Sequence, residues 1–281
     1  MSDVGNLVRS MVAATHPVPA AVVTLFALAL ALPVAPTIGR ALLVTAAVGA
    51  GQLSIGWSND WLDAARDRQV GRTDKPTVRG SVTPATLRTG AFVAAAVSAV
   101  LGLAAGPVAG VANVGVVAGG WAYNLGLKRT AWSWLPYAVA FGLLPAFVVA
   151  AAGGGRVVAG WAVLAGALLG VGAHVANVLP DLDDDRATGV RGLPHRLGRR
   201  GAGVVAPVVL GAGSVVTLIG PPGAPALPAL LLTAGACLLA VAAGAVGLVR
   251  PHSRAPFLLS MAVAAVCVTE VVLAADAVGA G

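Results

Sequence analysis

The sequence predicts an all-α polytopic membrane protein in which nine transmembrane helices surround a central cavity. Three observations indicate this class: 58% of the 281 residues are hydrophobic, only 10% are charged, and the apolar residues form long uninterrupted runs. An ordinary soluble domain has about a quarter of its residues charged, and no soluble fold of this length buries so much apolar surface. We expect residues 1–281 to form a single transmembrane domain.

Each apolar run has the length of a membrane-spanning helix, which needs about 17–25 residues. The 37 glycines and the many alanines favour close packing of helices in lipid, where small residues let backbones approach one another. The nine expected spans are, in order, 18–36, 39–58, 84–105, 107–124, 133–152, 157–178, 203–220, 226–249 and 256–275.

The distribution of basic residues predicts the orientation of these spans, because Lys and Arg accumulate in cytoplasmic segments. With the N-terminus inside, all of the 18 basic residues except Arg40 and Arg156 fall on the cytoplasmic side. Eight or ten spans would scramble this alternation. The net charge of +7 is therefore mainly a topology signal, and the scattered basic residues form no face for nucleic acid. We expect an integral protein of the plasma membrane with its N-terminus in the cytoplasm.

Two cytoplasmic loops, residues 59–80 and 177–200, resemble each other at a constant offset of 118 residues. This internal repeat predicts two related helix bundles, each of which offers one loop to a shared central cavity. The repeated residues are Asn59, Asp63, Asp67, Arg68, Gly71 and Pro76 in the first loop, and Asn177, Asp181, Asp185, Arg186, Gly189 and Pro194 in the second.

The two loops also hold eight of the eleven acidic residues of the chain. If the second span continues as a helix, Asp60, Asp63 and Asp67 lie on one helical face, because residues three and four apart are neighbours there. The same spacing places His174, Asn177, Asp181 and Asp185 on one face. Each loop is therefore expected to point a stripe of carboxylates in one direction.

Converging carboxylates repel one another and are costly to desolvate near a membrane, so they favour a bound divalent cation. Mg²⁺ suits this site better than zinc, because the ligands are oxygens and Mg²⁺ commonly completes its shell with substrate phosphates. Basic residues around the acids suit the charge of a diphosphate; they are Arg68, Arg72, Lys75, Arg79, Lys128, Arg129, Arg186 and Arg191.

The first loop, from Asn59 to Asp67, resembles the Asn-Asp-x-x-Asp-x-x-x-Asp signature of the UbiA superfamily of intramembrane prenyltransferases. The segment from Asp181 to Asp185 is similar to the second aspartate motif of that superfamily. Further similarity lies in Lys75-Pro76-x-x-Arg79-Gly80, in Tyr123-Asn124 followed by Lys128-Arg129, and in nine spans over nearly the whole chain.

The resemblance implies two Mg²⁺ ions that bind an isoprenyl diphosphate, ionisation of its allylic C–O bond, and attack by an acceptor. It implies that the metal ligands or their supports are Asn59, Asp60, Asp63, Asp67, Asp181 and Asp185, and that Arg72, Lys75, Arg79, Tyr123 and Lys128 face the diphosphate. Asn177 joins these groups through the repeat, and Arg68, Arg129 and Arg186 are further candidates for substrate binding. The expected catalytic residues are Asp63, Asp67, Asp181, Asp185, Tyr123 and Lys128.

The acceptor is less well defined by the sequence. Many aromatic prenyltransferases of the superfamily carry an Arg-Pro segment before the first span, whereas this chain has His16-Pro17, which disfavours a carboxylated acceptor. We expect an aromatic or quinone-precursor acceptor, with His16 and His174 as candidates to bind it or to take up its proton. A membrane-bound terpene cyclase, which needs the same metal site and no acceptor, is the main alternative, and a cation transporter is a weaker one.

Several residues have structural interpretations as well. Six aromatic residues near the predicted membrane ends are expected mainly to form an interfacial belt: Trp57, Trp61, Trp121, Trp132, Trp134 and Tyr137. Five basic residues are expected to act as topology anchors: Arg196, Arg199, Arg200, Arg250 and Arg254.

Overall fold

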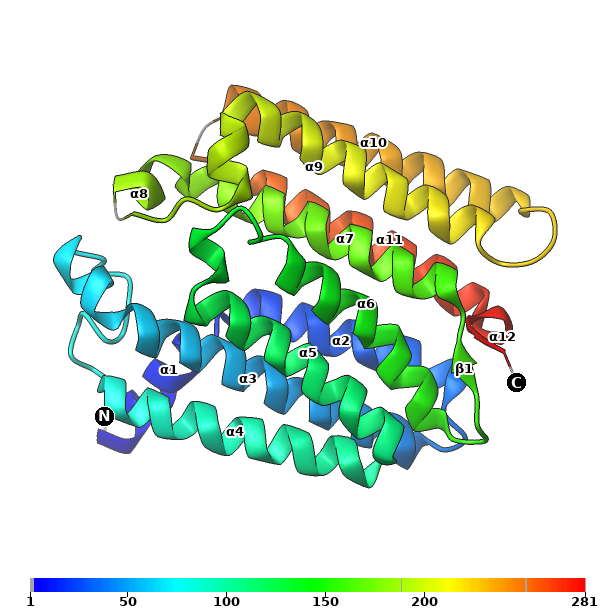
Figure 1. Ribbon diagram of the computed structural model, residues 1–281, viewed down its shortest axis with the longest axis horizontal. Helices are drawn as coiled ribbons and strands as arrows, with labels where there is room; N and C mark the ends of the chain where they lie inside the picture. The colour runs from blue at the N-terminus through cyan, green and yellow to red at the C-terminus, as the bar shows by residue number, and fades with distance from the viewer. Residues whose placement is uncertain (1–2, 188, 251, 281) are drawn as a thin grey trace.

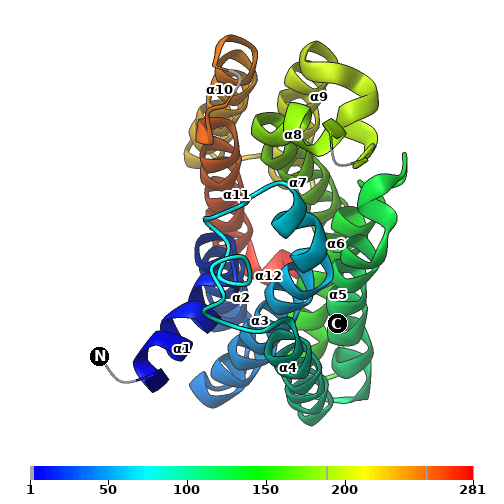
Figure 2. The same cartoon turned by 90° about the vertical axis from the view of Figure 1, so that its left-hand side faces the viewer.

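Long helices run side by side through the whole molecule and surround a common centre (Figures 1 and 2). The computed structural model describes residues 3–187, 189–250 and 252–280. Its α-helices are α1 (Asp3–Ala13), α2 (Pro17–Val34), α3 (Ile38–Gln69), α4 (Pro84–Ala104), α5 (Pro107–Leu125), α6 (Leu135–Ala152), α7 (Gly160–Val178), α8 (Leu182–Ala187), α9 (Leu193–Ile219), α10 (Leu227–Val249), α11 (Ala255–Leu273) and α12 (Ala275–Val278). Short 3₁₀ turns are η1 (Leu127–Arg129) and η2 (Leu179–Asp181), and β1 (Val157–Val158) pairs antiparallel with β2 (Gly279–Ala280).

The expected all-α membrane fold is confirmed. Eight helices of the described chain are long and apolar enough to cross a membrane, and they correspond to eight of the nine expected spans. The remaining helix, α5, has 19 residues and carries Asn113 and Asn124, and it is not among those eight. The expected number of nine spans is therefore not confirmed, although α5 packs against α3, α4 and α6.

Prolines set where many of these helices begin. A proline stands at the first or second helical position, where its missing N–H removes no helical hydrogen bond and its fixed φ suits a helix, in α2, α4, α5, α6, α9, α10 and α11. Threonine hydroxyls cap two helices: Thr37 accepts a hydrogen bond from the backbone N–H of Arg40 at 3.2 Å, and Thr83 accepts one from Thr86 at 3.1 Å.

The sequence repeat corresponds to a repeat of helices. A shift of about 118 residues carries α2, α3, α4 and α5 onto α6, α7, α9 and α10 in chain order. The packing partners repeat too, since α3 contacts α2 and α4, and α7 contacts α6 and α9. The fold thus brings the ends of α3 and α7, which carry the two aspartate motifs, to the same end of the bundle.

Polar side chains tie the helices together inside the apolar core. The buried Asn113 of α5 donates to the carbonyl and hydroxyl oxygens of Ser98 at 2.9 Å each, and Ser98 donates to the carbonyl of Ala47 at 2.7 Å. At the start of α3, Arg40 donates to the carbonyls of Ala105 and Ala151 at 2.8 and 2.7 Å. These carbonyls lie at the C-terminal ends of α4 and α6. Arg40, one of the two basic residues that were not expected on the cytoplasmic side, therefore links the ends of two helices.

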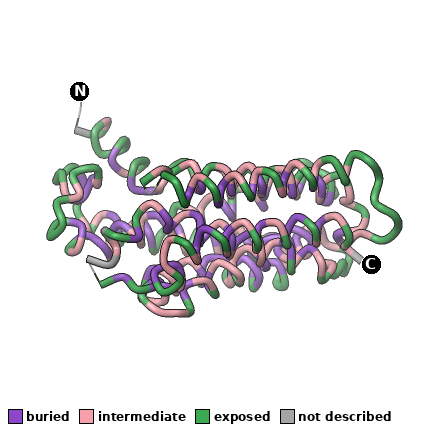
Figure 3. Tube along the Cα trace, turned by 90° about the horizontal axis from the view of Figure 1, so that it is seen from above, coloured by how far each residue is buried: buried purple, intermediate pink, exposed green. Residues whose placement is uncertain are grey.

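The structure extends the expected elements at the ends of the bundle. Helix α3 continues eleven residues beyond the expected span, and α9 begins ten residues before it, with a break at Gly198, where φ is 68°. The helix α1, which precedes the first span, was not expected from the sequence. Figure 3 shows that the two termini lie at opposite ends of the bundle and that buried residues follow the inner faces of the helices.

Candidate functional site

A cavity of about 360 Å³ lies at the bundle centre and is lined by residues of both repeats. The first repeat contributes Asn59 and Asp63 from α3, and the second contributes Asn177 from α7, Asp181 from η2 and Asp185 from α8. The cavity therefore joins carboxylates that are more than a hundred positions apart in sequence. Its polar end lies under the loops that follow α3 and α7.

The continuation of α3 as a helix explains how the first motif is presented. Asp60, Asp63 and Asp67 are all buried, with exposed fractions of 1, 3 and 1%. The ammonium group of Lys128, which η1 carries, donates to both carboxylate oxygens of Asp63 at 2.6 and 2.7 Å. Arg66 approaches the same carboxylate at 3.3 Å. Burial lowers the pKa of Lys128, and the charge of Asp63 opposes this shift.

Asp60 has a different environment from Asp63. One of its carboxylate oxygens accepts hydrogen bonds from Lys75 at 2.7 Å and from Asn59 at 3.3 Å, and it lies 2.9 Å from Nε2 of His16. His16 has φ of 55°, and it is the one non-glycine residue with positive φ among the described residues. The carboxylate of Asp60 thus links Asn59 and Lys75 of the first motif loop to His16, which precedes α2.

Two buried carboxylate oxygens remain open to a further partner. Oδ2 of Asp60 and Oδ2 of Asp67 make no hydrogen bond within the described part of the chain. A buried carboxylate oxygen without a partner is costly, and a cation or a hydrogen-bond donor would satisfy it. These two oxygens flank Asp63 along α3, but Asp60 and Asp67, unlike Asp63, are not among the described residues that line the cavity.

The loop after α3 places further positively charged side chains beside the cavity. Arg72 and Lys75 line it together with Arg66 and Lys128. Arg72 forms a two-pronged pair with Asp74, with both N–O distances 2.9 Å. This pair raises the pKa of Arg72 and lowers the pKa of Asp74 to about 2. Both groups therefore stay charged at neutral pH, and Asp74 holds the guanidinium of Arg72 in place.

The second motif lies on η2 and α8 rather than on a continued α7. Asp181 is exposed at the cavity, and Asp185 approaches the buried His195 with an O–N distance of 3.3 Å. Arg199 donates to the carbonyl of Leu179 in η2 and to Asp183, both at 3.1 Å. The expected role of Arg199 as a topology anchor is thus incomplete, because its guanidinium also holds the turn that carries Asp181.

An aromatic cluster closes one wall of the polar end. The rings of Tyr123 and Tyr137 meet edge to face at 5.2 Å, and the imidazole of His174 lies 4.7 Å from the Tyr137 ring. His174 is buried and lies 3.1 Å from the hydroxyl oxygen of Ser133, which accepts a hydrogen bond from the backbone N–H of Leu193 at 2.8 Å. His174 therefore supports the wall from behind rather than lining the cavity.

The structure leaves some expected site residues apart from the cavity. Arg68, Arg79 and Arg129 are exposed and are absent from its described lining. The side chain of Arg186 lies outside the described residues. Arg66 and Asn124 also line the cavity. The sequence pointed to Asn124 only through the Tyr123-Asn124 part of the resemblance, and the signal for Arg66 was its helical phase relative to Asp63, three residues away.

The donor set of this cavity fits Mg²⁺. The available groups are carboxylate and amide oxygens, which are the ligands of a hard cation. Within the described residues, no three His, Cys, Asp or Glu side chains are gathered closely enough to hold a metal alone. Because Mg²⁺ usually keeps few protein carboxylates and takes further ligands from substrate phosphates, this arrangement suits a metal bound together with a diphosphate.

Comparison with known proteins agrees with this geometry. The sequence model of the UbiA prenyltransferase family matches residues 20–266. The chain belongs to the UbiA prenyltransferase family. Members of this family are prenyltransferases, and the match includes both aspartate motifs. A search of curated proteins finds no match.

Solved structures show the same UbiA fold. A UbiA homologue from Archaeoglobus fulgidus, solved with GPP and Mg²⁺, has 15% identity and a TM-score of 0.72, over 96% of this chain and 99% of that one. A homologue from Aeropyrum pernix K1 has 23% identity and a TM-score of 0.71, over 90% and 97% of the two chains. A digeranylgeranylglyceryl phosphate synthase has 16% identity and a TM-score of 0.67, over 98% and 99%.

Proposed function

We propose that this UbiA-family protein is a Mg²⁺-dependent intramembrane prenyltransferase that ionises an isoprenyl diphosphate and transfers the prenyl group to a small acceptor. The observation that carries this proposal is the shared cavity, in which both motifs lie beside Lys75 and Lys128. Relatives of the same fold were solved with GPP and Mg²⁺ and with DMAPP and Mg²⁺, which supports the choice of substrate and metal.

The metal would be held by the acidic end of the cavity. Asn59, Asp63, Asp181 and Asp185 would supply ligands, and Asp60 and Asp67 would support them from within α3. We propose two ions, one for each repeat. When bound, Mg²⁺ supplies the positive charge that stabilises a departing diphosphate.

The basic residues have a distinct part in the reaction. Lys75, Lys128 and Arg72 would bind the diphosphate oxygens, since charge-assisted hydrogen bonds to phosphate are strong. As the allylic C–O bond breaks, its electron pair leaves with the diphosphate, and these cations stabilise the growing negative charge. The ring of Tyr123 would face the carbocation, whose charge is attracted to an aromatic face. Arg68, Arg129, Arg79 and Arg186 would add positive charge around the mouth.

The acceptor would approach on the side of His16 and Asn177. Its carbon would form the new bond to the prenyl C1, and it would then lose a proton to restore its π system. An aromatic or quinone-precursor acceptor fits this chemistry. We place the protein in the plasma membrane, with the N-terminus and both motif loops facing the cytoplasm, because the basic residues gather at that end.

One experiment separates this proposal from the alternatives. Purified protein is incubated with Mg²⁺ and allylic diphosphates, with and without a membrane extract, and the products are identified by mass. A prenylated product that requires the extract supports the transferase. A hydrocarbon formed without extract would instead identify a terpene cyclase, and the absence of diphosphate release under both conditions would refute the enzymatic proposal.

A further inference from the structure

The loop that joins α5 to α6 touches both halves of the candidate site. Near its start, the ammonium group of Lys128 pairs with Asp63 of the first motif. Near its end, the fully buried Ser133 contacts α7 and the beginning of α9, which are the two helices that flank the second motif. One short loop therefore connects the first motif to the second.

The hydroxyl group of Ser133 is the centre of this contact. Its oxygen accepts a hydrogen bond from the backbone N–H of Leu193 at 2.8 Å and lies 3.1 Å from Nε2 of His174. A hydroxyl has one hydrogen and two lone pairs, so it can serve both partners at once, whichever ring nitrogen of His174 carries the hydrogen. His174 stands three residues before Asn177, which lines the cavity. Ser133 thus holds the loop on α7 and on α9.

The hydrogen bond from Leu193 also caps α9. The first N–H groups of a helix have no partner inside the helix, and Gly192, the residue before α9, has no side chain that could accept one. The N–H of Leu193 finds its acceptor 60 residues away in the chain, on Ser133. Because α9 begins where the loop of the second motif ends, the position of that loop depends on Ser133.

Gly192 lets the two loops approach closely. A Cβ atom at this position would lie 2.7 Å from the hydroxyl oxygen of Ser133 and 2.8 Å from the carbonyl oxygen of Lys128. The backbone of Gly192 is extended, with φ of −65° and ψ of −179°, and any residue can adopt this conformation. The lack of space therefore favours glycine here. The contact joins the second motif loop to the backbone of the residue whose ammonium group pairs with Asp63.

We propose that Ser133 is a positioning residue that, together with Gly192, sets the separation of Asp63 from the carboxylates of the second motif. This inference rests on the proposed function, because it concerns how the two halves of that site are held relative to each other. Ser133 and Gly192 are not among the described residues that line the cavity, so they act through the loops that they join. A misplacement of about 1 Å in an active site can cost about 10²-fold in rate.

The first test compares Ser133→Ala with the parent. Diphosphate release gives kcat and KM, and hydrogen–deuterium exchange is followed in peptides that cover residues 126–135 and 189–196. We expect kcat to fall about tenfold, because the two motifs no longer converge accurately, and KM to change by less than about twofold, because Lys128 stays paired with Asp63. Exchange in both peptides should be about fivefold faster, the factor expected for one lost hydrogen bond.

Gly192→Ala tests the same contact from the other side. Its added methyl group must displace the Ser133 hydroxyl and the Lys128 carbonyl, so kcat should fall and both peptides should exchange faster, as in Ser133→Ala. The effects of residues in contact are not additive, so the double variant should lose little more kcat than the worse single variant. Gly192→Ala also keeps the inference testable if Ser133→Ala fails to fold.

Two matched controls lie away from the cavity. Ser253→Ala removes a hydroxyl that accepts the backbone N–H of Ala255 at the start of α11, at 3.1 Å, and so removes a helix cap of the same kind. Gly235→Ala adds a methyl group in α10 where, in the described chain, a Cβ would meet nothing within 4 Å beyond its own helix. Both variants should keep the kcat of the parent and its exchange in the two loop peptides.

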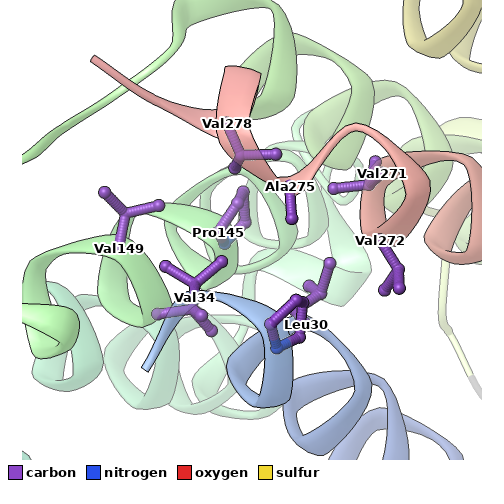
Figure 4. Close-up of a pocket in the computed structure, with 10 residues that line it drawn as sticks. Leu30, Val34, Pro145, Val149, Val271, Val272, Ala275 and Val278 are labelled. Carbon is purple, nitrogen blue, oxygen red and sulfur yellow. The ribbon is translucent and has the colours of Figure 1, made fainter. Parts of the chain in front are cut away.

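A third control separates positioning from a general loss of stability. At the opposite end of the bundle, Figure 4 shows Val34 of α2, Val149 of α6 and Val278 of α12 around a cavity of about 10 Å³. Val149 is fully buried, so Val149→Ala enlarges this cavity and should lower Tm. Its kcat at temperatures below Tm, and its exchange in the two loop peptides, should match those of the parent.

Three results would overturn the inference. One is a parent-like kcat and loop exchange in both single variants, and another is a double variant whose loss of kcat is the product of the two single losses. The third is a loss of kcat in Val149→Ala as large as in Ser133→Ala, which would mean that activity follows stability alone. If the parent releases no diphosphate, the proposed function fails, whereas loop exchange still tests whether Ser133 holds the two loops together.

Discussion

Asp63 and Asp181 stand at equivalent positions of the two repeats and line the same central cavity. Asp63 is buried and paired with a lysine, whereas Asp181 is exposed to the cavity on a short turn. The repeat is therefore symmetric in sequence but not in environment. A diphosphate between them would meet one preorganised carboxylate and one on the more open side.

Removal of either carboxylate should abolish most activity. Asp63→Asn and Asp181→Asn keep the size of the side chain but remove a charged ligand, and we expect turnover to fall by about 10²–10³-fold, as for the loss of one strong electrostatic contact in an active site. Diphosphate release by the purified variants at saturating substrate measures this. Asp276→Asn, at an exposed position in α12 at the opposite end of the bundle, is the control and should match the parent.

Lys128 should contribute more to binding than to bond cleavage. Its ammonium contacts Asp63 in the structure and lines the cavity. We expect Lys128→Met to raise KM for the diphosphate about tenfold, since one hydrogen bond to a charged group contributes about 1.5 kcal/mol, with a smaller fall in kcat. Lys128→Arg should restore much of the affinity. An unchanged KM with kcat as low as that of Asp63→Asn would show that Lys128 acts in the chemical step.

Arg199 should affect activity through the turn that it holds. Because its guanidinium contacts the carbonyl of Leu179 and the carboxylate of Asp183, Arg199→Ala should loosen η2 and lower turnover several-fold, but less than Asp181→Asn does. The neighbouring Arg200 is exposed, and Arg200→Ala serves as the matched control. Equal activities of the two alanine variants would contradict this positioning role.

His16 should tolerate only residues that accept a positive φ. A β-branched residue at φ of 55° is strained by about 1–3 kcal/mol, and each kcal/mol lowers Tm by about 2–4 °C in a chain of this size class. We expect His16→Val to lower Tm by several degrees, while His16→Asn, which adopts this conformation readily, stays close to the parent. Thermal unfolding in detergent measures the difference, and equal Tm values for the two variants would refute the assignment of strain.

Much of the fold could be predicted because the bilayer imposes simple rules. Apolar runs of fixed length gave the spans, and the fixed offset between Asn59 and Asn177 gave the repeat, which the order of the helices reproduces. The elements that escaped prediction are short or amphipathic, such as α1 and α12. Helix α1 has 11 residues and α12 has four, so neither forms the long apolar run that predicts a span.

The sequence predicted which types of residue form the candidate site, but not which side chains contact one another there. Helical phase placed Asp60 and Asp63 on one face, but only the folded chain shows that Lys75 contacts the former and Lys128 the latter. Of the expected stripe after α7, Asn177, Asp181 and Asp185 line the cavity and His174 does not, and the helix tightens into η2 before Asp181. Contacts between distant segments, such as that of His16 with Asp60, have no local signature.

The dependence of diphosphate release on a divalent cation tests the central claim most directly, namely that the two motifs form one Mg²⁺-dependent diphosphate site. The measurement is release of diphosphate from farnesyl diphosphate by the purified protein in chelator, then after addition of excess Mg²⁺, with the double variant Asp63→Asn and Asp181→Asn in parallel. The account predicts that release stops in chelator, returns with Mg²⁺ in the parent, and does not return in the variant. Release that continues undiminished in chelator, or that returns equally in the variant, would contradict it.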